Sequence, residues 1–203
     1  MSPQDTKEAI RQRIWGLLEA KDIASFPRPC SGRIPNFVGS RKASERIKET
    51  PEFKRAKCVF SAPDYVLKRV REIVLEEGKV LAVALPHMVG FLEILERRSI
   101  DKATTIKGFK RYGEPLKTKV ALFVQGSVAV DRYGDRLGKG AGYGDQEWDW
   151  LIKHDLMSPD TKVVTIVHDE QVLDDFSHLM KPTDKMVNYI LTPTRIIEVQ
   201  KKV

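Results

Sequence analysis

The chain alternates short apolar runs with helix-like stretches, and this alternation constrains the fold more than any other feature. Residues 79–86 (KVLAVALP) and 120–130 (VALFVQGSVAV) are nearly continuous apolar runs, as is typical of strands buried on both faces of a sheet. Residues 64–78, which precede the first of these runs, predict a helix with Asp64 as N-cap and Gly78 as C-cap. Further strands are predicted at 56–62, 161–169, 186–194 and 195–199, and further helices at 4–21, 39–50 and 146–156. The pattern predicts an α/β domain with a mainly parallel sheet, in which ligands bind at the carboxyl ends of strands.

No internal repeat or low-complexity tract divides the chain, so we expect one domain over residues 1–203. Residues 22–37 contain three prolines and little periodicity and predict an irregular segment. The helix predicted at 39–50 should end before Pro51, because helices usually stop before a proline.

The composition favours anionic partners. The formal net charge is +7, and the basic residues are spread along the chain. Such a surface is compatible with binding of nucleotide phosphates, polycarboxylates and, less strongly, RNA. No apolar run approaches the roughly 18–20 residues that span a bilayer, and the first residues lack a signal-peptide stretch. We therefore expect a cytoplasmic protein without membrane contact. Cys30 and Cys58 lie far apart without a CxxC pair, which favours buried thiols over a metal site or a disulfide.

Residues 136–148 (RLGKGAGYGDQEW) form a glycine-rich loop between an apolar strand and a helix. Its glycines are Gly138, Gly140, Gly142 and Gly144. Without β-carbons, backbone N–H groups can converge on an anion, Lys139 adds a charge, and a helix N-terminus favours phosphate. The spacing is neither that of a Walker A loop nor that of a Rossmann fingerprint. Two interpretations remain, a phosphate cradle or a structural turn, and Asp145 is either an N-cap or a Mg²⁺ ligand.

Other side chains also have two interpretations each. Lys7 and Arg11 are four residues apart on the first predicted helix, where they form either two solvated cations or a phosphate grip. His168 ends a predicted strand, either as a proton-transfer group or as a structural histidine. The tryptophans Trp15, Trp148 and Trp150 are interpreted as helix-packing residues.

Residues 131–145 (DRYGDRLGKGAGYGD) resemble the signature of the 5-formyltetrahydrofolate cyclo-ligase family, roughly D-x-x-G-x-R-L-G-[RK]-G-x-G-Y-Y-D. The matching positions are Asp131, Gly134, Arg136, Leu137, Gly138, Lys139, Gly140, Gly142, Tyr143 and Asp145. KEAIR (7–11) and VVTIVHDEQV (163–172) resemble flanking family segments in the same order. Segments such as GSVAV (126–130) and YILTPTRII (189–197) resemble the methenyltetrahydrofolate-synthetase-domain-containing branch, some of whose longer members add an RNA-recognition motif. The resemblance covers nearly the full length and is weakest across 51–115.

The resemblance implies a three-layer α/β/α fold like that of sugar-phosphate isomerases and CoA transferases. It also implies a reaction in which ATP phosphorylates the formyl oxygen of 5-formyltetrahydrofolate, N10 attacks the activated carbon, and phosphate leaves to give the 5,10-methenyl product. The implied ligands are ATP, Mg²⁺ and a reduced folate or related pterin, and we expect a monomer or a small homo-oligomer.

The resemblance also assigns roles to residues. Lys7 and Arg11 would grip the ATP phosphates. Lys139, Arg136 and Tyr143 would act in catalysis, and Asp145 and Asn188 would bind Mg²⁺. The residues that would enclose the nucleotide are Arg136, Leu137, Gly138, Lys139, Gly140, Ala141, Gly142 and Tyr143.

Three positions depart from the family pattern. The family usually carries lysine at the position of Ala141, a second tyrosine at that of Gly144, and an aspartate at that of Asn188. A nucleotide- or RNA-binding module without the chemistry is therefore the alternative function, and a sugar-phosphate enzyme of the same fold is a weaker third. Phe91 and Tyr112 are the aromatic candidates for a pterin pocket, with core packing as their other interpretation.

Overall fold

The computed structural model describes residues 6–200, and these residues form one large and one small β-sheet with helices around them. The strands of the large sheet are β1 (Cys58–Ser61), β2 (Val80–Ala84), β3 (Phe91–Ile94), β4 (Gly113–Pro115), β5 (Val120–Gly126), β8 (Met157–Ile166), β10 (Tyr189–Leu191) and β11 (Ile196–Glu198). They lie in the order β11-β10-β8-β5-β1-β2-β3-β4. The small sheet consists of β7 (Arg136–Leu137), β6 (Ala129–Asp131) and β9 (Val172–Leu173).

The centre of the large sheet is parallel and its edges are antiparallel. Strands β10, β8, β5, β1 and β2 run in one direction, whereas β3, β4 and β11 pair antiparallel with their neighbours. The central strands are buried on both faces, which is why their sequences are continuous apolar runs. The prediction of a mainly parallel α/β sheet is confirmed.

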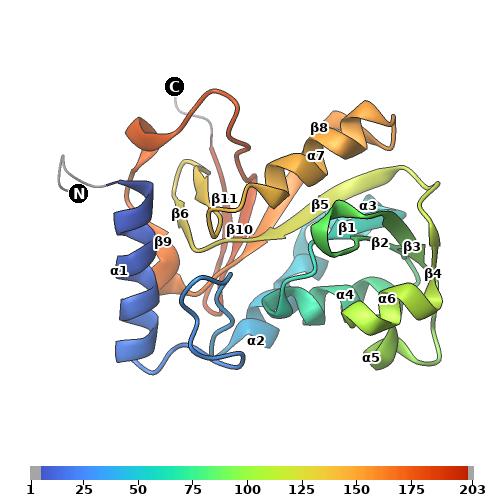
Figure 1. Cartoon of the computed structure of the whole chain (residues 1–203), viewed down its shortest axis with the longest axis horizontal. Helices are drawn as coiled ribbons and strands as arrows, with labels where there is room; N and C mark the ends of the chain where they lie inside the picture. Colours follow the sequence, from blue (N-terminus) through green and yellow to red (C-terminus); the bar gives the residue numbers. More distant parts are fainter. Residues whose placement is uncertain (1–5, 201–203) are drawn as a thin grey trace.

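Helices cover both faces of this sheet. The α-helices are α1 (Lys7–Ala20), α2 (Ser40–Glu45), α3 (Pro51–Arg55), α4 (Lys68–Glu76), α5 (Ile100–Ala103), α6 (Ile106–Tyr112) and α7 (Tyr143–Lys153). The short 3₁₀ turns are η1 (Arg46–Glu49), η2 (Tyr65–Leu67), η3 (Pro86–Met88), η4 (Asp169–Gln171) and η5 (Ser177–Leu179). Figure 1 shows α4, α5 and α6 below the sheet and α7 above it, as the predicted three-layer α/β/α arrangement requires.

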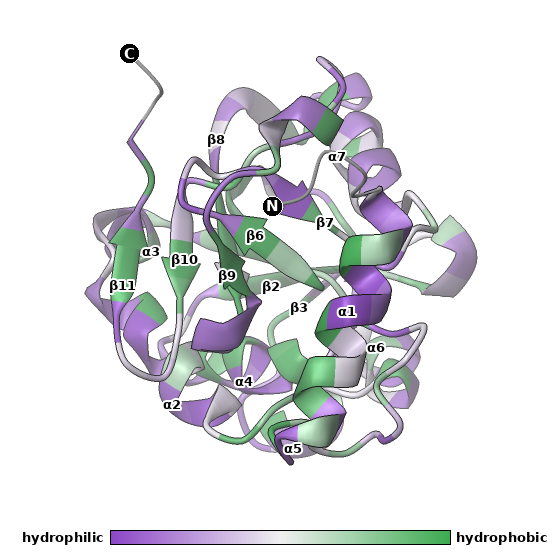
Figure 2. Cartoon of the chain, turned by 90° about the vertical axis from the view of Figure 1, so that its left-hand side faces the viewer, coloured by the Kyte–Doolittle hydropathy of each residue, from purple (hydrophilic) through white to green (hydrophobic). Residues whose placement is uncertain are grey.

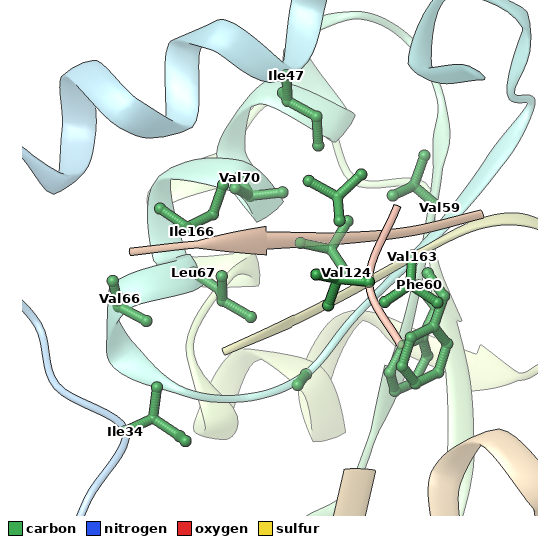
Figure 3. Close-up of a cluster of buried hydrophobic side chains, with 14 of the residues drawn as sticks. Ile34, Ile47, Val59, Phe60, Val66, Leu67, Val70, Val124, Val163 and Ile166 are labelled. Atoms are coloured by element: carbon green, nitrogen blue, oxygen red, sulfur yellow. The ribbon is translucent and has the colours of Figure 1, made fainter. Parts of the chain in front are cut away.

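The core lies between the central strands and the helices beneath them. Figure 3 shows Val59 and Phe60 of β1 beside Val124 of β5, with Val163 and Ile166 of β8 close by. The rings of Phe60 and Phe123 stack with centroids 4.6 Å apart. Burial of such apolar surface is the main stabilising contribution to a sheet of this kind.

Helix α1 lies at one end of the large sheet and packs on β6 and η4 (Figures 1 and 2). Its first turn is capped by the Thr6 hydroxyl, which accepts from the Ala9 N–H at 3.1 Å. Ile10, Ile14 and Leu18 recur at helical spacing and are almost fully buried. The predicted helix at 4–21 is confirmed from Lys7 onward, and residues 4 and 5 lie outside the described residues.

The apolar run at 120–130 is two strands rather than one, so the sequence prediction was wrong here. β5 ends at Gly126, and β6 enters the small sheet at Ala129. The chain turns where Gly126 approaches Ile34, since a β-carbon at Gly126 would lie 2.4 Å from Ile34 Cγ2. The buried Gln171 amide donates to the carbonyls of Ser127 and Val128, so it satisfies backbone groups that the strand break leaves without partners.

The segment around Pro51 is also more helical than predicted. The helix expected at 39–50 forms as α2 and η1 and ends before Pro51, as predicted. Pro51 then starts α3, where its missing N–H costs nothing at the first position and Thr50 caps the helix. Residues 22–37 are irregular as predicted, apart from an isolated bridge between Ala24 and Phe37. Strands β3 and β4 and helices α5 and α6, in the segment where the resemblance is weakest, were not predicted.

Within residues 6–200, no helix combines the length and the apolar character that a bilayer crossing would need.

Candidate active site

A cavity of about 490 Å³ opens at the carboxyl ends of three neighbouring parallel strands. Its lining includes residues 62–64 after β1, Leu85 and Pro86 after β2, and Gln125 and Gly126 at the end of β5. In α/β sheets this edge is where ligands bind, because the loops that follow the strands meet there. The cavity is therefore the candidate active site.

The glycine-rich loop forms one side of the cavity, and we call residues 136–145 together with Lys7 and Arg11 the loop wall. Gly140 and Gly142 have φ values of +101° and +71°, in the left-handed region that side chains rarely adopt. Helix α7 starts immediately afterwards, so the unpaired N–H groups of its first turn lie at this wall. Gly142 is the N-cap and Asp145 lies in the first turn, which excludes the interpretation of Asp145 as N-cap.

Two basic side chains of α1 tie this helix to distant parts of the cavity. Arg11 Nε donates to the Gly138 carbonyl at 2.7 Å. Lys7 Nζ lies 2.5 Å from Asp184 Oδ2, and this aspartate also lines the cavity. Neither cation is simply solvated, because each one fixes a neighbouring segment of the wall.

Arg136 differs from these two cations because it has no partner. Its guanidinium makes no hydrogen bond or ion pair with any of residues 6–200, and its Nε is buried without an acceptor. Burial lowers the pKa of Arg136, and the carboxylates of Asp145 and Asp64 oppose this shift. Lys139 is exposed at the same wall. A buried guanidinium group without a hydrogen-bond acceptor is costly unless an anion from outside accepts from it, so this wall is suited to an anionic ligand.

We call the part of the cavity lining that contains Asp64, Gln125 and Glu147 the floor. The sequence did not mark its two carboxyl groups as site residues. Glu147 is only 6% exposed, and burial, with a smaller contribution from Asp64, raises its pKa to about 8. Burial also raises the pKa of Asp64, against the opposing charge of Lys139. Asp64 does precede a helical turn, η2, but its side chain makes no capping hydrogen bond, so the prediction that it caps a helix was wrong.

Two carboxylates of the cavity lining offer the oxygen donors that Mg²⁺ prefers. Asp145, the last residue of segment 136–145 in the loop wall, and Asp184 both line the cavity. Among residues 6–200 no group of three or more His, Cys, Asp or Glu side chains is placed to hold a metal. Mg²⁺ commonly takes only one or two protein carboxylates and completes its shell with phosphate oxygens and water. The residues present therefore fit a magnesium–phosphate complex better than a metal held by protein alone.

Another part of the cavity lining, outside the loop wall, is mostly apolar, and we call it the far wall. It consists of Pro27, Ile34, Tyr65, Leu85, Met88 and Ile106. At its edge His87 and Met88 have φ values of +58° and +59°, a conformation that costs energy for residues other than glycine. His87 Nδ1 lies 3.4 Å from the Tyr143 hydroxyl, so a polar contact links the two walls.

The structure brings together all but one of the predicted site residues. The predicted residues that line the cavity are Lys7, Arg11, Arg136, Leu137, Gly138, Lys139, Gly140, Ala141, Gly142, Tyr143 and Asp145. Asn188 is the exception, because it does not line the cavity, and its role as a Mg²⁺ ligand stays a prediction. Its amide oxygen accepts from the Val163 N–H at 2.8 Å, within the large sheet and outside the cavity lining. Asp184, four residues earlier, is the late aspartate that lines the cavity.

Neither aromatic candidate for a pterin pocket lines the cavity. Phe91 is 5% exposed and stacks on Trp150 with centroids 4.0 Å apart. Tyr112 packs against the core. The tryptophans are packing residues as predicted, since Trp148 lies edge-on to Phe123 and Trp15 is buried.

His168 is a structural residue. Its Nδ1 accepts from the Glu170 N–H at 3.1 Å and so caps η4. Its ring lies edge-on to Phe37 with centroids 5.7 Å apart, and it does not line the cavity. Cys30 and Cys58 are buried free thiols, and burial raises both pKa values, to about 11 and about 12.

Comparison with known proteins identifies the group to which these features correspond. The model of the "5-formyltetrahydrofolate cyclo-ligase family" matches residues 3–193. The methenyltetrahydrofolate synthase domain-containing protein of Homo sapiens is 40% identical over 203 residues, covering 95% of this chain and 53% of that protein. The protein of the same name from Bos taurus is 39% identical over the same shares of the two chains. The chain thus spans about half the length of the curated relatives it matches.

A solved structure supports the fold. The 5,10-methenyltetrahydrofolate synthetase of Aquifex aeolicus superimposes with a TM-score of 0.61 at 20% identity, over 97% of this chain and 94% of that one. At this identity the likeness shows a shared fold and nothing further.

Proposed function

Because the chain belongs to the 5-formyltetrahydrofolate cyclo-ligase family, we propose that it is an ATP- and Mg²⁺-dependent cyclo-ligase. The reaction would convert 5-formyltetrahydrofolate, or a related formylated pterin, to the 5,10-methenyl form with release of ADP and phosphate. A formamide oxygen is a poor leaving group, and its phosphorylation turns it into a good one. Such a reaction depends on positioning and cationic stabilisation, and needs no nucleophilic side chain.

The loop wall is the proposed site of the ATP phosphates. The observation that carries this assignment is the Arg136 guanidinium, which lies in the cavity wall with a buried Nε and no protein acceptor. Lys139 and the N-terminus of α7 add positive potential beside it. Arg11 holds the loop in place through the Gly138 carbonyl and leaves the loop N–H groups free for the phosphates.

Asp145 and Asp184 are the residues that would hold Mg²⁺. Asn188 is not included in this proposal, because it does not line the cavity. A bound Mg²⁺ would neutralise charge on the phosphate oxygens. The proposed tasks of the protein are to orient the phosphoryl group through Arg136 and Lys139 and to exclude water with Tyr143 and the far wall.

The far wall is the proposed site of the folate. Its side chains are apolar or aromatic, as is suitable for a flat ring system, and it lines the same cavity as the loop wall. The formyl group of a ring that lies on this wall would point towards the phosphates. The apolar contacts of the substrate ring would then come from residues outside the loop wall.

An alternative function is nucleotide binding without turnover. Ala141 is exposed at the loop wall and offers no charge where the family usually has a lysine. Loss of one such cation lowers catalysis by about 3 kcal/mol in related electrostatic sites. Under this alternative the protein binds ATP but does not change 5-formyltetrahydrofolate.

The decisive experiment follows the methenyl chromophore in the near ultraviolet with protein, ATP, Mg²⁺ and 5-formyltetrahydrofolate. We expect absorbance to rise with the wild-type protein and turnover to fall about 10²- to 10³-fold in Lys139→Ala. Lys153→Ala is the matched control, because Lys153 is exposed at the other end of α7. A folded protein that binds ATP and gives no chromophore would support the alternative.

We further propose that residues 1–203 act as one domain, as a monomer or small homo-oligomer. The proposed substrates, ATP and a reduced folate, are consistent with a cytoplasmic location.

A further inference from the structure

The floor of the cavity contains a polar group that no contact in the protein explains. Gln125, at the end of β5, is 2% exposed and lines the cavity. Its Oε1 atom is buried and has no hydrogen-bond donor within residues 6–200. An unsatisfied buried acceptor normally costs stability, so its presence in a cavity wall points to a donor supplied from outside.

Gly144 shows what surrounds this amide. A β-carbon at Gly144 would lie 2.6 Å from Gln125 Oε1 and 2.8 Å from Arg136 Nη2. The Gln125 amide and the Arg136 guanidinium therefore both lie against the first turn of α7, in space that any side chain at position 144 would take. The family's usual tyrosine is incompatible with this arrangement, so the floor of this cavity differs from that of a typical member.

Two carboxyl groups complete the floor. Glu147, one turn along α7 from Gly144, is 6% exposed and lines the cavity, and no hydrogen bond joins its carboxyl group to the described residues. Asp64 lines the cavity nearby, with Oδ2 3.4 Å from the β-carbon position of Gly126. The floor thus offers acceptor oxygens from Gln125, Glu147 and Asp64, and a cationic donor from Arg136.

This set suits a ligand edge rich in N–H groups. The buried oxygen of Gln125 is an acceptor without a donor, and phosphate oxygens are acceptors too, so the floor does not extend the phosphate site of the loop wall. A ring edge with an amino group and a ring N–H would donate to the oxygens, and a carbonyl beside them would accept from a basic donor. The 2-amino-4-oxo edge of a reduced pterin has this order of donors and acceptor.

We propose that Gln125 and Glu147 form a specificity subsite that binds the amino-substituted edge of the substrate ring, with Gly144 leaving the space for it. This inference deepens the proposed function and rests on it for the identity of the substrate. The subsite recognises the ligand edge by hydrogen bonds. An analogue without the amino group leaves buried acceptors unpaired and therefore binds more weakly.

The test measures the binding of two probes to the intact protein, and turnover with ATP and Mg²⁺ is measured separately. The first is 5-formyltetrahydrofolate, by calorimetry without ATP. The second is the pair of fragments 2-amino-4-oxopyrimidine and 4-oxopyrimidine, by ligand-observed NMR. The variants are Gln125→Leu and Glu147→Gln, with Glu114→Gln on the exposed edge strand β4 as control.

We expect each variant to weaken binding of 5-formyltetrahydrofolate about 10-fold or more, with the affinity for ATP unchanged. The wild-type protein should bind the fragment without the amino group more weakly than the fragment with it. The variants should bind the two fragments equally. Gln125→Leu should have a melting temperature no lower than that of the wild type, because the amide oxygen that it removes has no partner. A purely structural role of Gln125 predicts the opposite, a lower melting temperature with unchanged ligand selectivity.

The outcomes separate this proposal from the cyclo-ligase assignment. Turnover of 5-formyltetrahydrofolate by both variants with wild-type KM would overturn the subsite and leave the cyclo-ligase intact. Selective fragment binding that the variants lose, in a protein without turnover, would support the subsite and remove the cyclo-ligase. Absence of binding of either probe to the wild-type protein would overturn both.

Discussion

The loop wall and the far wall line the same cavity, but the chain supplies them in different ways. Most of the loop wall comes from ten consecutive residues, 136–145, and it carries cations and bare backbone. The far wall comes from five separate segments between Pro27 and Ile106 and is mostly apolar. The proposed phosphate site is thus contained in one local stretch of sequence, whereas the proposed site for a flat ring is assembled by the fold from distant segments.

The difference has a physical cause. Backbone N–H groups converge on phosphate only where successive residues take special φ values, so that chemistry requires neighbours in sequence. Apolar contact has no such requirement, because any side chains that the topology brings together can provide it. The two walls should therefore respond differently to single substitutions.

The largest expected effect is on the loop wall. Arg136→Ala removes the guanidinium of the loop wall whose buried Nε has no acceptor among residues 6–200, and kcat/KM for the proposed reaction should fall about 10²- to 10³-fold. The affinity for ATP, measured by calorimetry, should fall as well. Arg132→Ala is the control, since this exposed arginine lies against Tyr133 outside the cavity. An equal loss in both variants would show that the effect is not specific to the wall.

The next effect is at the floor, where the two walls meet, and it is a dependence of stability on pH. Burial raises the pKa of Glu147 from about 4.5 to about 8, so the folded state holds this proton more tightly than the unfolded chain. The contribution to stability is complete below about pH 4.5 and is lost as pH rises from there to about 8. The free energy of unfolding should fall by about 1.4 kcal/mol per pH unit in this window from this group.

Denaturant melts between pH 5 and pH 8 would measure this slope, and Glu147→Gln should lack it. The variant should also be more stable than the wild type at pH 8, because it carries no buried charge. Equal slopes in the two proteins would mean that Glu147 is ionised in the folded state throughout this range.

The smallest effect concerns the contact between loop and floor at Gly144. Gly144→Ala places a β-carbon 2.6 Å from Gln125 Oε1, so the unfolding free energy should fall by about 1–2 kcal/mol as the amide is displaced. Gly16→Ala is the control in α1, where nothing lies within 4 Å of the added carbon, and it should stabilise the protein by about 1 kcal/mol. If Gly144→Ala is stabilising, the space under α7 is larger than the structure shows.

The sequence predicted the parts of the fold and site that depend on local patterns. Apolar runs predicted β1, β2 and β5, and the glycine-rich stretch predicted the loop wall with Arg136 and Lys139. The division of residues 120–130 between two sheets was missed, because it depends on the close approach of Ile34 to Gly126. No local pattern encodes a contact between segments so far apart.

The same limit explains why the sequence did not mark some of the residues that line the cavity. Asp184 was passed over in favour of Asn188, because family order alone assigned the late carboxylate and the irregular chain before β10 has no period to fix its register. Glu147 follows the glycine stretch closely, but its burial against Asp64 depends on how α7 packs. Gln125 ends an apolar strand, and only the enclosed position shows that its oxygen lacks a donor.

The contacts of α1 have a consequence for the order in which the protein is built. Arg11 bonds to a carbonyl 127 residues later, and Lys7 pairs with a carboxylate 177 residues later. The helix precedes both anchors in the chain, and strands β1 to β5 of the large sheet are synthesised between α1 and Gly138. The loop wall is thus completed by contacts between segments far apart in sequence, and contacts of this kind tend to form slowly.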